Sequence, residues 1–333
     1  MKLLMKDEAR GKEHTIFVTI FAALMVMLVI MVMLMASAIA VSGVTLRLNE
    51  NAVDILDKQV ENRARYIEAQ LQQAQDLTDL STYINDTVQQ MLDKGTISLD
   101  TLDSTGGESL PLLEAAAPRL LRTLRSKQVS GVFLILNTHD FTDRTSGDRL
   151  PCVYLRDLDP EATPSANNSD VMFERAPAEL VQAFGITTDK AWTPAQQYLD
   201  GEEDVFYVRP FQAAYESGEW TGAAADYGRW TTLPYTLLGD DREAIAYAQP
   251  LILDDGTVYG VLGIEMLESY METKLPWDEL QNAHHGSYLL ASTTSDLRGE
   301  ELQLHVTSNT GDQKTALRKE GWELTLHRAK DYW

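Results

Sequence analysis

The sequence predicts an α+β protein in which an N-terminal transmembrane helix continues into a long stalk helix, and an antiparallel sheet lobe follows. Three observations predict this fold. No residue between His14 and Arg47 is charged, residues 48–91 contain neither Pro nor Gly, and the chain beyond Gly131 contains several short β-branched and aromatic runs. The first pattern is typical of a membrane span, the second of a long helix and the third of strands.

Residues 15–43 are expected to cross a membrane, because about 20 consecutive apolar residues suffice to span a bilayer. A cleaved signal peptide is the alternative, since basic residues precede this segment and small residues end it. The apolar part of a signal peptide is only about 7–15 residues long, which favours an uncleaved anchor. The tail of residues 1–14 carries four basic residues, so the positive-inside rule places it in the cytoplasm. We therefore expect a single-pass protein of the cell membrane with its bulk outside.

The net charge of −22 arises from 28 Lys and Arg against 50 Asp and Glu. The tail holds four of the basic and three of the acidic residues, which leaves 24 basic and 47 acidic residues, a charge of −23, for the rest of the chain. Such an acidic surface argues against nucleic acid as a partner, because phosphate groups are bound by basic surfaces. The single cysteine, Cys152, excludes an intrachain disulfide.

Residues 44–94 are expected to form the stalk helix. Apolar residues recur every seven positions, in one row from Val53 to Ala74 and in a second from Leu77 to Met91. This period indicates a nearly straight helix with a slowly rotating apolar stripe. The stripe fits either the protein's own lobe or a second copy of the chain, and we expect a homodimer through the stalk.

Beyond the stalk the pattern alternates between helix and strand. We expect a loop at residues 94–111, and then a helix at 112–127 that Pro118 kinks or restarts. Strands are expected at residues 131–137 and 152–158, a short helix at 178–184 and a helical or turn segment at 192–201. Three late strands are expected at residues 286–293, 302–310 and 322–330. Residues 244–253 and 257–266 are two apolar runs joined at an Asp255-Gly256 step, a strong hairpin signal. Gly260 and Gly263 in the second run suggest a close approach to the backbone or a bulge.

The segment GRWTTLPY, residues 228–235, followed by AIAYAQPLILDDGTVYGVLGIEM, residues 244–266, resembles the extracellular double Cache sensor domain of bacterial transmembrane receptors. The resemblance implies a membrane-distal, PAS-like lobe with a five-stranded antiparallel sheet, which we assign to residues 95–283. It also implies a smaller membrane-proximal lobe, of which residues 284–333 supply an incomplete start. In this family a second span and a histidine kinase, diguanylate cyclase or chemotaxis domain follow, so we expect a truncated receptor.

The resemblance also implies a site for a small amino-acid-like or carboxylated ligand. A guanidinium group would bind the ligand's carboxylate, and an acid with aromatic walls would bind its ammonium. The residues so assigned are Tyr207, Tyr227, Arg229, Trp230, Tyr235, Tyr247 and Glu265. Two positions depart from the pattern of amino-acid sensors, which have Asp in place of Glu265 and an aromatic residue in place of Thr231.

Each of these residues also has a structural interpretation. Arg229 could pair with a surface acid, and the aromatic residues could be core residues, with Tyr207 and Tyr247 expected in strands. Glu265 lies in an otherwise apolar strand, where an unpaired buried charge is costly, unless strand alternation turns it toward solvent. It is therefore the strongest single candidate.

The sequence does not indicate an enzyme. It lacks the GxSxG, GxxxxGK[ST] and GxGxxG patterns, and His284-His285 does not have the spacing of a helical metal site. We expect no cofactor and no metal. A ligand-sensing receptor domain is the favoured function, a cell-surface interaction module is the main alternative, and an anchored extracytoplasmic hydrolase is the third.

Overall fold

The computed structural model describes residues 2–199, 206–218, 223–231, 234–276, 288–293 and 302–307. The chain divides into two units, Met1–Glu61 and Asn62–Trp333. Helix α1, Lys2–Gln75, begins in the first unit and ends in the second.

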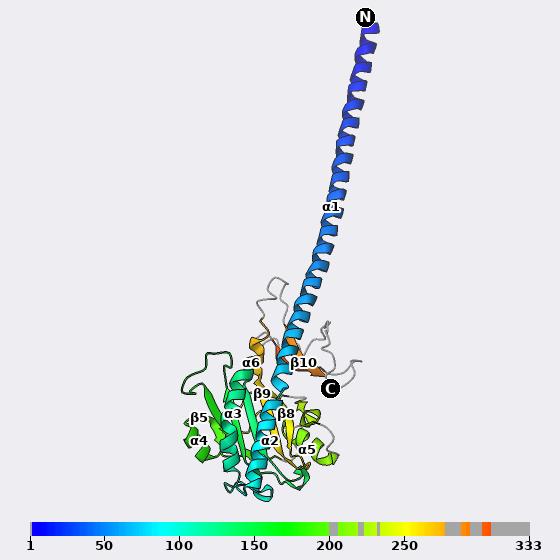
Figure 1. Ribbon diagram of the computed structural model, residues 1–333. Helices are drawn as coiled ribbons and strands as arrows, with labels where there is room; N and C mark the ends of the chain where they lie inside the picture. Colours follow the sequence, from blue (N-terminus) through cyan, green and yellow to red (C-terminus); the bar gives the residue numbers. More distant parts are fainter. Residues whose placement is uncertain are drawn as a thin grey trace. The chain divides into compact units, whose positions relative to one another are not determined.

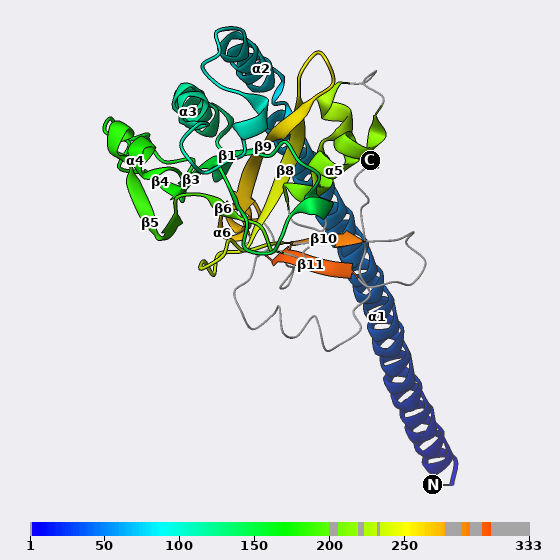
Figure 2. The ribbon, with the colours of Figure 1, turned by 90° about the horizontal axis from the view of Figure 1, so that it is seen from below.

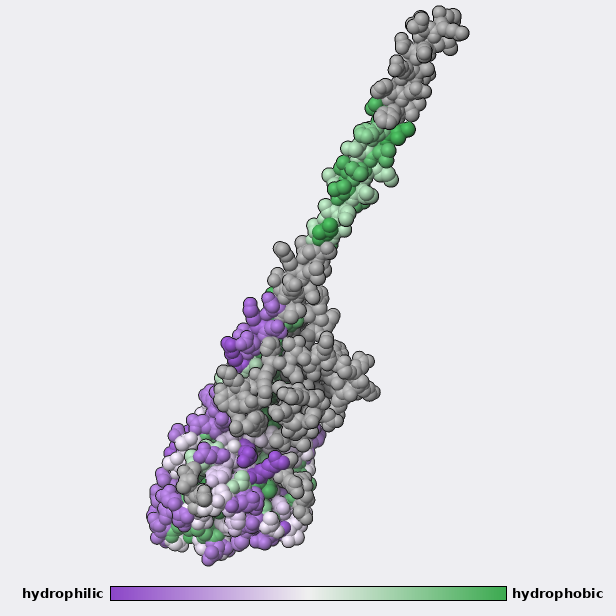
Figure 3. Space-filling view, turned by 90° about the vertical axis from the view of Figure 1, so that its right-hand side faces the viewer, coloured by the Kyte–Doolittle hydropathy of each residue, from purple (hydrophilic) through white to green (hydrophobic). Residues whose placement is uncertain are grey.

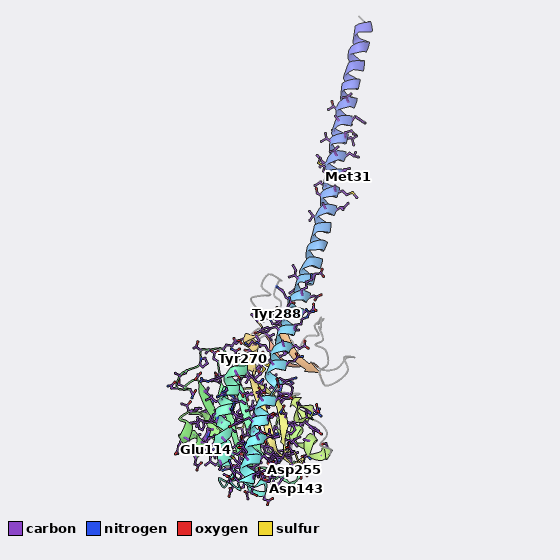
Figure 4. The ribbon with its side chains drawn as sticks, viewed as in Figure 1. Met31, Glu114, Asp143, Asp255, Tyr270 and Tyr288 are labelled. Carbon is purple, nitrogen blue, oxygen red and sulfur yellow. The ribbon has the colours of Figure 1, made fainter. Side chains whose placement is uncertain are left out.

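Within α1, Val18–Val41 is long and apolar enough to cross a membrane, with a mean hydropathy of 2.9 and no buried residue. Figure 3 shows this segment as a band of hydrophobic side chains, and Met31 marks its middle in Figure 4. The segment lies inside the span predicted for residues 15–43.

The prediction of one continuous stalk helix over residues 44–94 is wrong at one point, where the helix is interrupted. Helix α1 ends at Gln75 and α2, Thr78–Asp93, begins after a two-residue break. The Asp76 carboxylate accepts a hydrogen bond of 3.2 Å from the backbone N–H of Thr78. Hydrogen bonds from the Thr78 side chain and backbone also lower the pKa of Asp76. Asp side chains compete in this way with the helical hydrogen bonds of the backbone, so the sequence breaks the helix here without Gly or Pro.

The Asn62–Trp333 unit is built on a seven-stranded sheet of order β5-β4-β3-β1-β9-β8-β7 (Figure 1). Its strands are β1 Gly131–Leu136, β3 Cys152–Asp157, β4 Val171–Arg175, β5 Thr187–Thr193, β7 Arg229–Trp230, β8 Ala244–Ile252 and β9 Val258–Leu267. All neighbours are antiparallel except β4 and β5, which are parallel. The prediction of an α+β fold is confirmed. The sheet has two more strands than the five that the resemblance implied, and one of its pairs is parallel.

The sheet has two faces of different character. On the first, which we call the helix face, aliphatic side chains such as Leu134 and Ile264 pack under α2 and under α3, Leu110–Lys127. On the second, the aromatic face, Phe133 and its neighbours pack under α5, Val208–Ser217. Figure 2 shows α2 and α3 together on one side of the sheet and α5 beside β8. Alternate residues of β1 and of β3 belong to the two faces, as strand geometry requires.

The predicted hairpin is confirmed in β8 and β9, with a loop of a different kind. Leu253 and Thr257 are joined by a backbone hydrogen bond, and the N–H of Gly256 donates to the carbonyl of Leu253. Gly256 has a φ of +91°, whereas Asp255, labelled in this turn in Figure 4, does not have a positive φ. This is the three-residue hairpin loop that needs one left-handed residue rather than two.

Both glycines of β9 lie where another group approaches. A Cβ on Gly260 would be 2.6 Å from the carbonyl oxygen of Ile135, and a Cβ on Gly263 would be 2.2 Å from the Phe133 ring. The predicted close approach is therefore confirmed, and the Phe133 ring occupies the space over Gly263.

Helix α3 continues through Pro118, which contradicts the expected restart of the helix there. Pro118 removes the hydrogen bond to the carbonyl of Glu114, four residues earlier. Both residues are exposed, so a water molecule can donate a hydrogen bond to the Glu114 carbonyl (Figure 4).

Two further local predictions are wrong. Residues 192–201 were expected to be helical or turn, but β5 ends at Thr193 and β6, Gln196–Gln197, pairs with β2, Arg149–Leu150. Tyr207 was expected in a strand but directly precedes α5. In both cases a partner distant in sequence decides the conformation.

The remaining elements are short. They are α4 Ala178–Phe184, α6 Glu268–Thr273, the 3₁₀ helices η1 Leu99–Thr101, η2 Phe141–Asp143 and η3 Ala224–Tyr227, and the paired strands β10 Leu289–Thr293 and β11 Leu302–Thr307. The helix predicted for residues 178–184 is confirmed, as are the first two late strands. The third, residues 322–330, lies outside the described residues.

Candidate functional site

A row of cross-strand partners on the aromatic face brings two opposite charges together. Gly131 of β1 lies between Arg156 of β3 and Glu265 of β9. Because Gly131 has no side chain, the guanidinium of Arg156 can cross β1 and reach the carboxylate of Glu265. A Cβ at position 131 would be 2.8 Å from Glu265 Oε1 and 2.9 Å from Glu265 Cβ. The absence of a side chain at Gly131 thus leaves the space in which the Arg156–Glu265 ion pair forms.

Arg156 and Glu265 form a bidentate ion pair, and neither side chain has any exposed surface. Arg156 Nε donates to Glu265 Oε1 and Arg156 Nη2 to Glu265 Oε2, each at 2.7 Å. Such paired, parallel bonds are the strongest geometry available to arginine and a carboxylate. Burial opposes the charge of Arg156, but the neighbouring carboxylate of Glu265 outweighs it and raises the pKa of Arg156.

Two tyrosines complete the coordination of Glu265. The hydroxyl of Tyr235 donates to Glu265 Oε2 at 3.1 Å, the hydroxyl of Tyr154 donates to the same oxygen, and the two hydroxyls lie 2.8 Å apart. Burial, together with the neighbouring carboxylate of Glu265, raises the pKa of both tyrosines well above the usual range. Both phenols therefore stay protonated and act as donors.

On its other side Arg156 contacts a second set of acids. Arg156 Nη1 donates to Glu174 Oε1 at 3.0 Å and also to Asp240. Arg242 donates to Glu174 at 3.0 Å, to Asp189 at 2.9 Å and to Asp240 at 2.8 Å. We call Arg156, Glu174, Asp189, Asp240, Arg242 and Glu265 the buried charge cluster.

In this second set, the side chains of Glu174 and Asp240 have no exposed surface, and their pKa values shift in opposite directions. Burial raises the pKa of Glu174 to about 7, although Arg156 and Arg242 partly offset it. For Asp240 the effect of burial is outweighed by hydrogen bonds from Arg242 and Arg156, which lower the pKa to about 2. Glu174 Oε2 is buried and has no hydrogen-bond partner in the described part of the chain. The burial of the Glu174 carboxylate is therefore only partly compensated by hydrogen bonds.

Aromatic rings wall the site. The Phe206 ring stacks on Tyr235 with centroids 4.3 Å apart, and Phe133 stacks on Tyr154 at 5.1 Å. Tyr207 is buried on the same face, against Phe206. Tyr227 is partly buried and packs against the side chains of the aromatic face, and its hydroxyl lies 3.0 Å from Ser217 Oγ. Of the seven residues assigned from sequence, Tyr207, Tyr227, Tyr235 and Glu265 are thus packed on the aromatic face.

The other three residues divide between the faces. Trp230 pairs with Tyr247, and both side chains pack on the helix face with ring centroids 5.7 Å apart. Arg229 is exposed and pairs with Ala248, which belongs to the aromatic face. Adjacent residues of a strand point to opposite faces, so Arg229 and Trp230 do not line the same pocket. Trp230 instead donates to the side chain of Gln75, the last residue of α1, at 3.0 Å.

The sequence-based assignment missed Tyr154, Arg156, Glu174, Asp240 and Arg242. A signal was present for two of them. Cys152, Tyr154 and Arg156 alternate along a strand of otherwise apolar residues, and a charge there needs a buried partner for the same reason as Glu265. The acids come from a neighbouring strand and from a loop, and nothing in the local pattern of either indicates burial.

A metal or thiol site finds no support among the described residues. No group of three or more His, Cys, Asp and Glu side chains in that part of the chain could hold a metal ion. Cys152 lies in the aromatic face, and its burial raises the pKa of the thiol to about 12. A thiol of this kind stays protonated and is inert.

No family model matches the chain, and no curated protein matches it. Solved structures do match. The periplasmic sensory domain of the Campylobacter jejuni chemoreceptor Tlp1 is 15% identical, with a TM-score of 0.34, covering 71% of this chain and 70% of that one. The ligand-binding domain of the Campylobacter jejuni chemoreceptor Tlp3, solved with L-valine, is 10% identical, with a TM-score of 0.34, covering 82% and 79%.

A methyl-accepting chemotaxis protein X is 15% identical, with a TM-score of 0.31, and 70% of each chain is covered. These three proteins take part in chemotaxis. At such identities and TM-scores the likeness assigns no ligand and no function to this chain.

Proposed function

We propose that this chain is the extracytoplasmic ligand-sensing part of a single-pass membrane receptor, and that a small charged metabolite binds on the aromatic face. The sequence resemblance suggests an amino-acid-like or carboxylated ligand. One observation carries the proposal. The sheet buries a cluster of charges, although apolar residues of the same volume often give a protein equal or greater stability than a buried ion pair. Buried, pKa-shifted groups walled by aromatic rings are typical of binding sites.

Arg229 supplies a second charge on the same face. It lies two strands from β9, at roughly 10 Å for a strand spacing of about 4.8 Å, and is exposed. A long arginine side chain can bridge much of that distance. A ligand held between the cluster and Arg229 would therefore meet both an acidic and a basic group.

The two residues of β7 suggest how occupancy would reach the membrane helix. Arg229 belongs to the aromatic face, and the next residue, Trp230, is hydrogen-bonded to Gln75 at the end of α1. A ligand that moves Arg229 would move Trp230 and with it the end of α1, biasing an output by its differential affinity for two states. In this proposal α1 spans the membrane, its N-terminal tail is cytoplasmic, and the receptor is a homodimer through α1.

The test is thermal unfolding of the whole chain in detergent micelles with a panel of amino acids, organic acids, amines and purines. A ligand that binds the folded state raises the unfolding temperature by mass action. We expect at least one compound to do so, and Arg229→Ala to weaken the effect of any such compound that carries a carboxylate.

The matched control is Arg122→Ala, since Arg122 is an exposed arginine of α3 on the other side of the sheet. The proposal fails if no compound stabilises the chain. For a ligand that carries a carboxylate, it also fails if the two variants lose the stabilisation to the same extent.

A further inference from the structure

The charges around Glu174 do not balance. Four carboxylates meet there, those of Glu174, Asp189, Asp240 and Glu265, and three guanidiniums, those of Arg156, Arg175 and Arg242. Arg175 gives its hydrogen bonds to the carbonyls of Glu174, Ala191 and Leu238 rather than to a carboxylate. With every group ionised, one negative charge is in excess over the described residues.

The excess is localised at one atom. Both guanidiniums that reach Glu174 bind its Oε1, at 3.0 Å each. Its Oε2 has no partner among the described residues, although the side chain has no exposed surface. A buried carboxylate oxygen without a donor costs about 1–3 kcal/mol or more, and natural structures satisfy nearly all such groups.

Glu265, the residue assigned from sequence to a ligand's ammonium group, has no such vacancy. Its two oxygens already accept hydrogen bonds from two nitrogens of Arg156 and from the hydroxyls of Tyr154 and Tyr235. An ammonium group at Glu265 would have to displace a buried guanidinium. At Glu174 it would supply the missing donor.

We propose that the ligand is recognised through a single ammonium group at Glu174 Oε2, so that the receptor's ligand class is organic amines. This inference rests on the proposed function and names the chemistry of the same site. An ammonium cancels the excess negative charge and donates to the unpartnered oxygen. A carboxylate on the ligand gains nothing at Glu174 Oε2, because Glu174 and Asp189, which share Arg242, carry its own sign.

The approach runs past Arg242. Arg156 and Arg175 are buried, whereas the Arg242 side chain is 23% exposed and contacts both Glu174 and Asp189. Of the three guanidiniums it is the one that can swing into solvent. Asp240, which Arg242 also binds, lies in the segment between β7 and β8 that Arg175 holds through the carbonyl of Leu238. Entry of the amine would therefore loosen this segment first.

The test compares ligands that share one carbon skeleton. Ethylamine, alanine and propionate form one set, and isoamylamine, leucine and 4-methylpentanoate the other. Affinity is measured by isothermal titration and by thermal unfolding of the whole chain in detergent. We expect each amine to bind at least tenfold more tightly than the matching amino acid, and the carboxylates not to bind.

Glu174→Gln keeps the volume and the acceptor Oε1 but removes the charge, so it should weaken amine binding at least tenfold without unfolding the lobe. Asp157→Asn is the matched control, because Asp157 is another buried acid whose pKa burial raises, but it is not in the cluster. It should leave amine affinity unchanged.

The pH profile of the unmodified chain tests the same point without a variant. A proton on Glu174 competes with the ammonium, while ethylamine, like lysine, stays charged through this range. Affinity should therefore fall about tenfold between pH 8 and pH 6, for a carboxyl with a pKa of about 7.

Three outcomes overturn the inference and leave the sensor proposal standing. They are an amino acid that binds as tightly as its amine, a carboxylate that binds, and a Glu174→Gln variant that binds amines normally. If no member of either set binds and the broad panel is also silent, the sensor proposal falls as well.

Discussion

The helix face and the aromatic face share the same strands but differ in what they contain. On the helix face Leu134, Leu262 and Ile264 are fully buried among aliphatic neighbours. On the aromatic face the intervening positions hold Glu265 and Phe133, and buried ions and phenols lie beside the apolar side chains there. Close packing of apolar groups stabilises the fold, whereas buried ion pairs seldom do. The helix face therefore contributes stability through apolar packing, whereas the aromatic face combines apolar packing with the buried charge cluster.

The largest effect is expected when the guanidinium of Arg156, at the centre of the buried charge cluster, is removed. Arg156→Met leaves the carboxylates of Glu265, Glu174 and Asp240 buried without their main partner, and should cost about 3–5 kcal/mol of unfolding free energy. Chemical denaturation measures it. Arg119→Met, an exposed arginine over the Tyr83 ring, is the control and should cost under about 1 kcal/mol. Equal losses would show that the cluster is not special.

Truncation on the helix face should cost stability but not recognition. Leu134→Ala removes a fully buried side chain, and the resulting cavity should cost about 2–5 kcal/mol. Affinity for a ligand, measured well below the unfolding temperature, should stay within about twofold. A large loss of affinity in a folded Leu134→Ala variant would contradict the division between the faces.

Gly131→Ala tests the space in which the ion pair forms. The new Cβ meets Glu265 Oε1 and Cβ at 2.8 and 2.9 Å, so either β1 or the glutamate must shift. We expect a loss of about 1–3 kcal/mol, as for other overpacked interiors. The measurement is the denaturation midpoint. If Glu265→Ala in the same chain does not relieve part of the loss, steric conflict with the glutamate is not its cause.

Glu174→Gln should stabilise the chain, and its effect should depend on pH. Burial raises the pKa of Glu174 to about 7 in the folded state, from an ordinary value of 4.5 in the unfolded chain. The unfolded state therefore binds fewer protons between these values, so stability falls as pH rises through this window.

The penalty is complete above pH 7 and absent below about 4.5, and Gln removes it. Unfolding at pH 8 should show a gain on the order of 2 kcal/mol, and unfolding at pH 4 should show none. A gain of the same size at both pH values would rule out ionisation as the cause.

Trp230→Phe should give the smallest change. It removes the hydrogen bond to Gln75 but keeps an aromatic ring beside Tyr247, at a cost of about 0.5–1.5 kcal/mol. Ligand affinity should be unchanged, because Trp230 lies on the helix face. A clear loss of affinity would mean that Trp230 contacts the ligand, as the sequence-based assignment had it.

Much of the fold could be predicted because its signals are local. The apolar span, the β8–β9 hairpin and the helix at residues 178–184 are each encoded within fewer than thirty consecutive residues. The errors lie where a distant partner decides. Gln196–Gln197 is a strand because β2 is available to pair with it, and Tyr207 precedes a helix that packs on β8 and β9.

The candidate site could be predicted only in part. Glu265 was found because a charge in an apolar strand is conspicuous in any sequence. Its partner Arg156 lies 109 residues away, and only the order β3-β1-β9 brings the two together. Strand alternation alone would have separated Arg229 from Trp230, since neighbours in a strand cannot face one pocket.

The sequence by itself determined the apolar span, the alternating strands and the need of Glu265 for a buried partner, because periodicity and the cost of burying charge act on each segment independently. Only the tertiary structure decided which partner that would be. Arg156 reaches Glu265 because Gly131 leaves the intervening strand bare, and Glu174 keeps an unmatched oxygen because both of its arginines bind the other one. Both results depend on which strands become neighbours, and the pairing of strands is a property of the whole sheet.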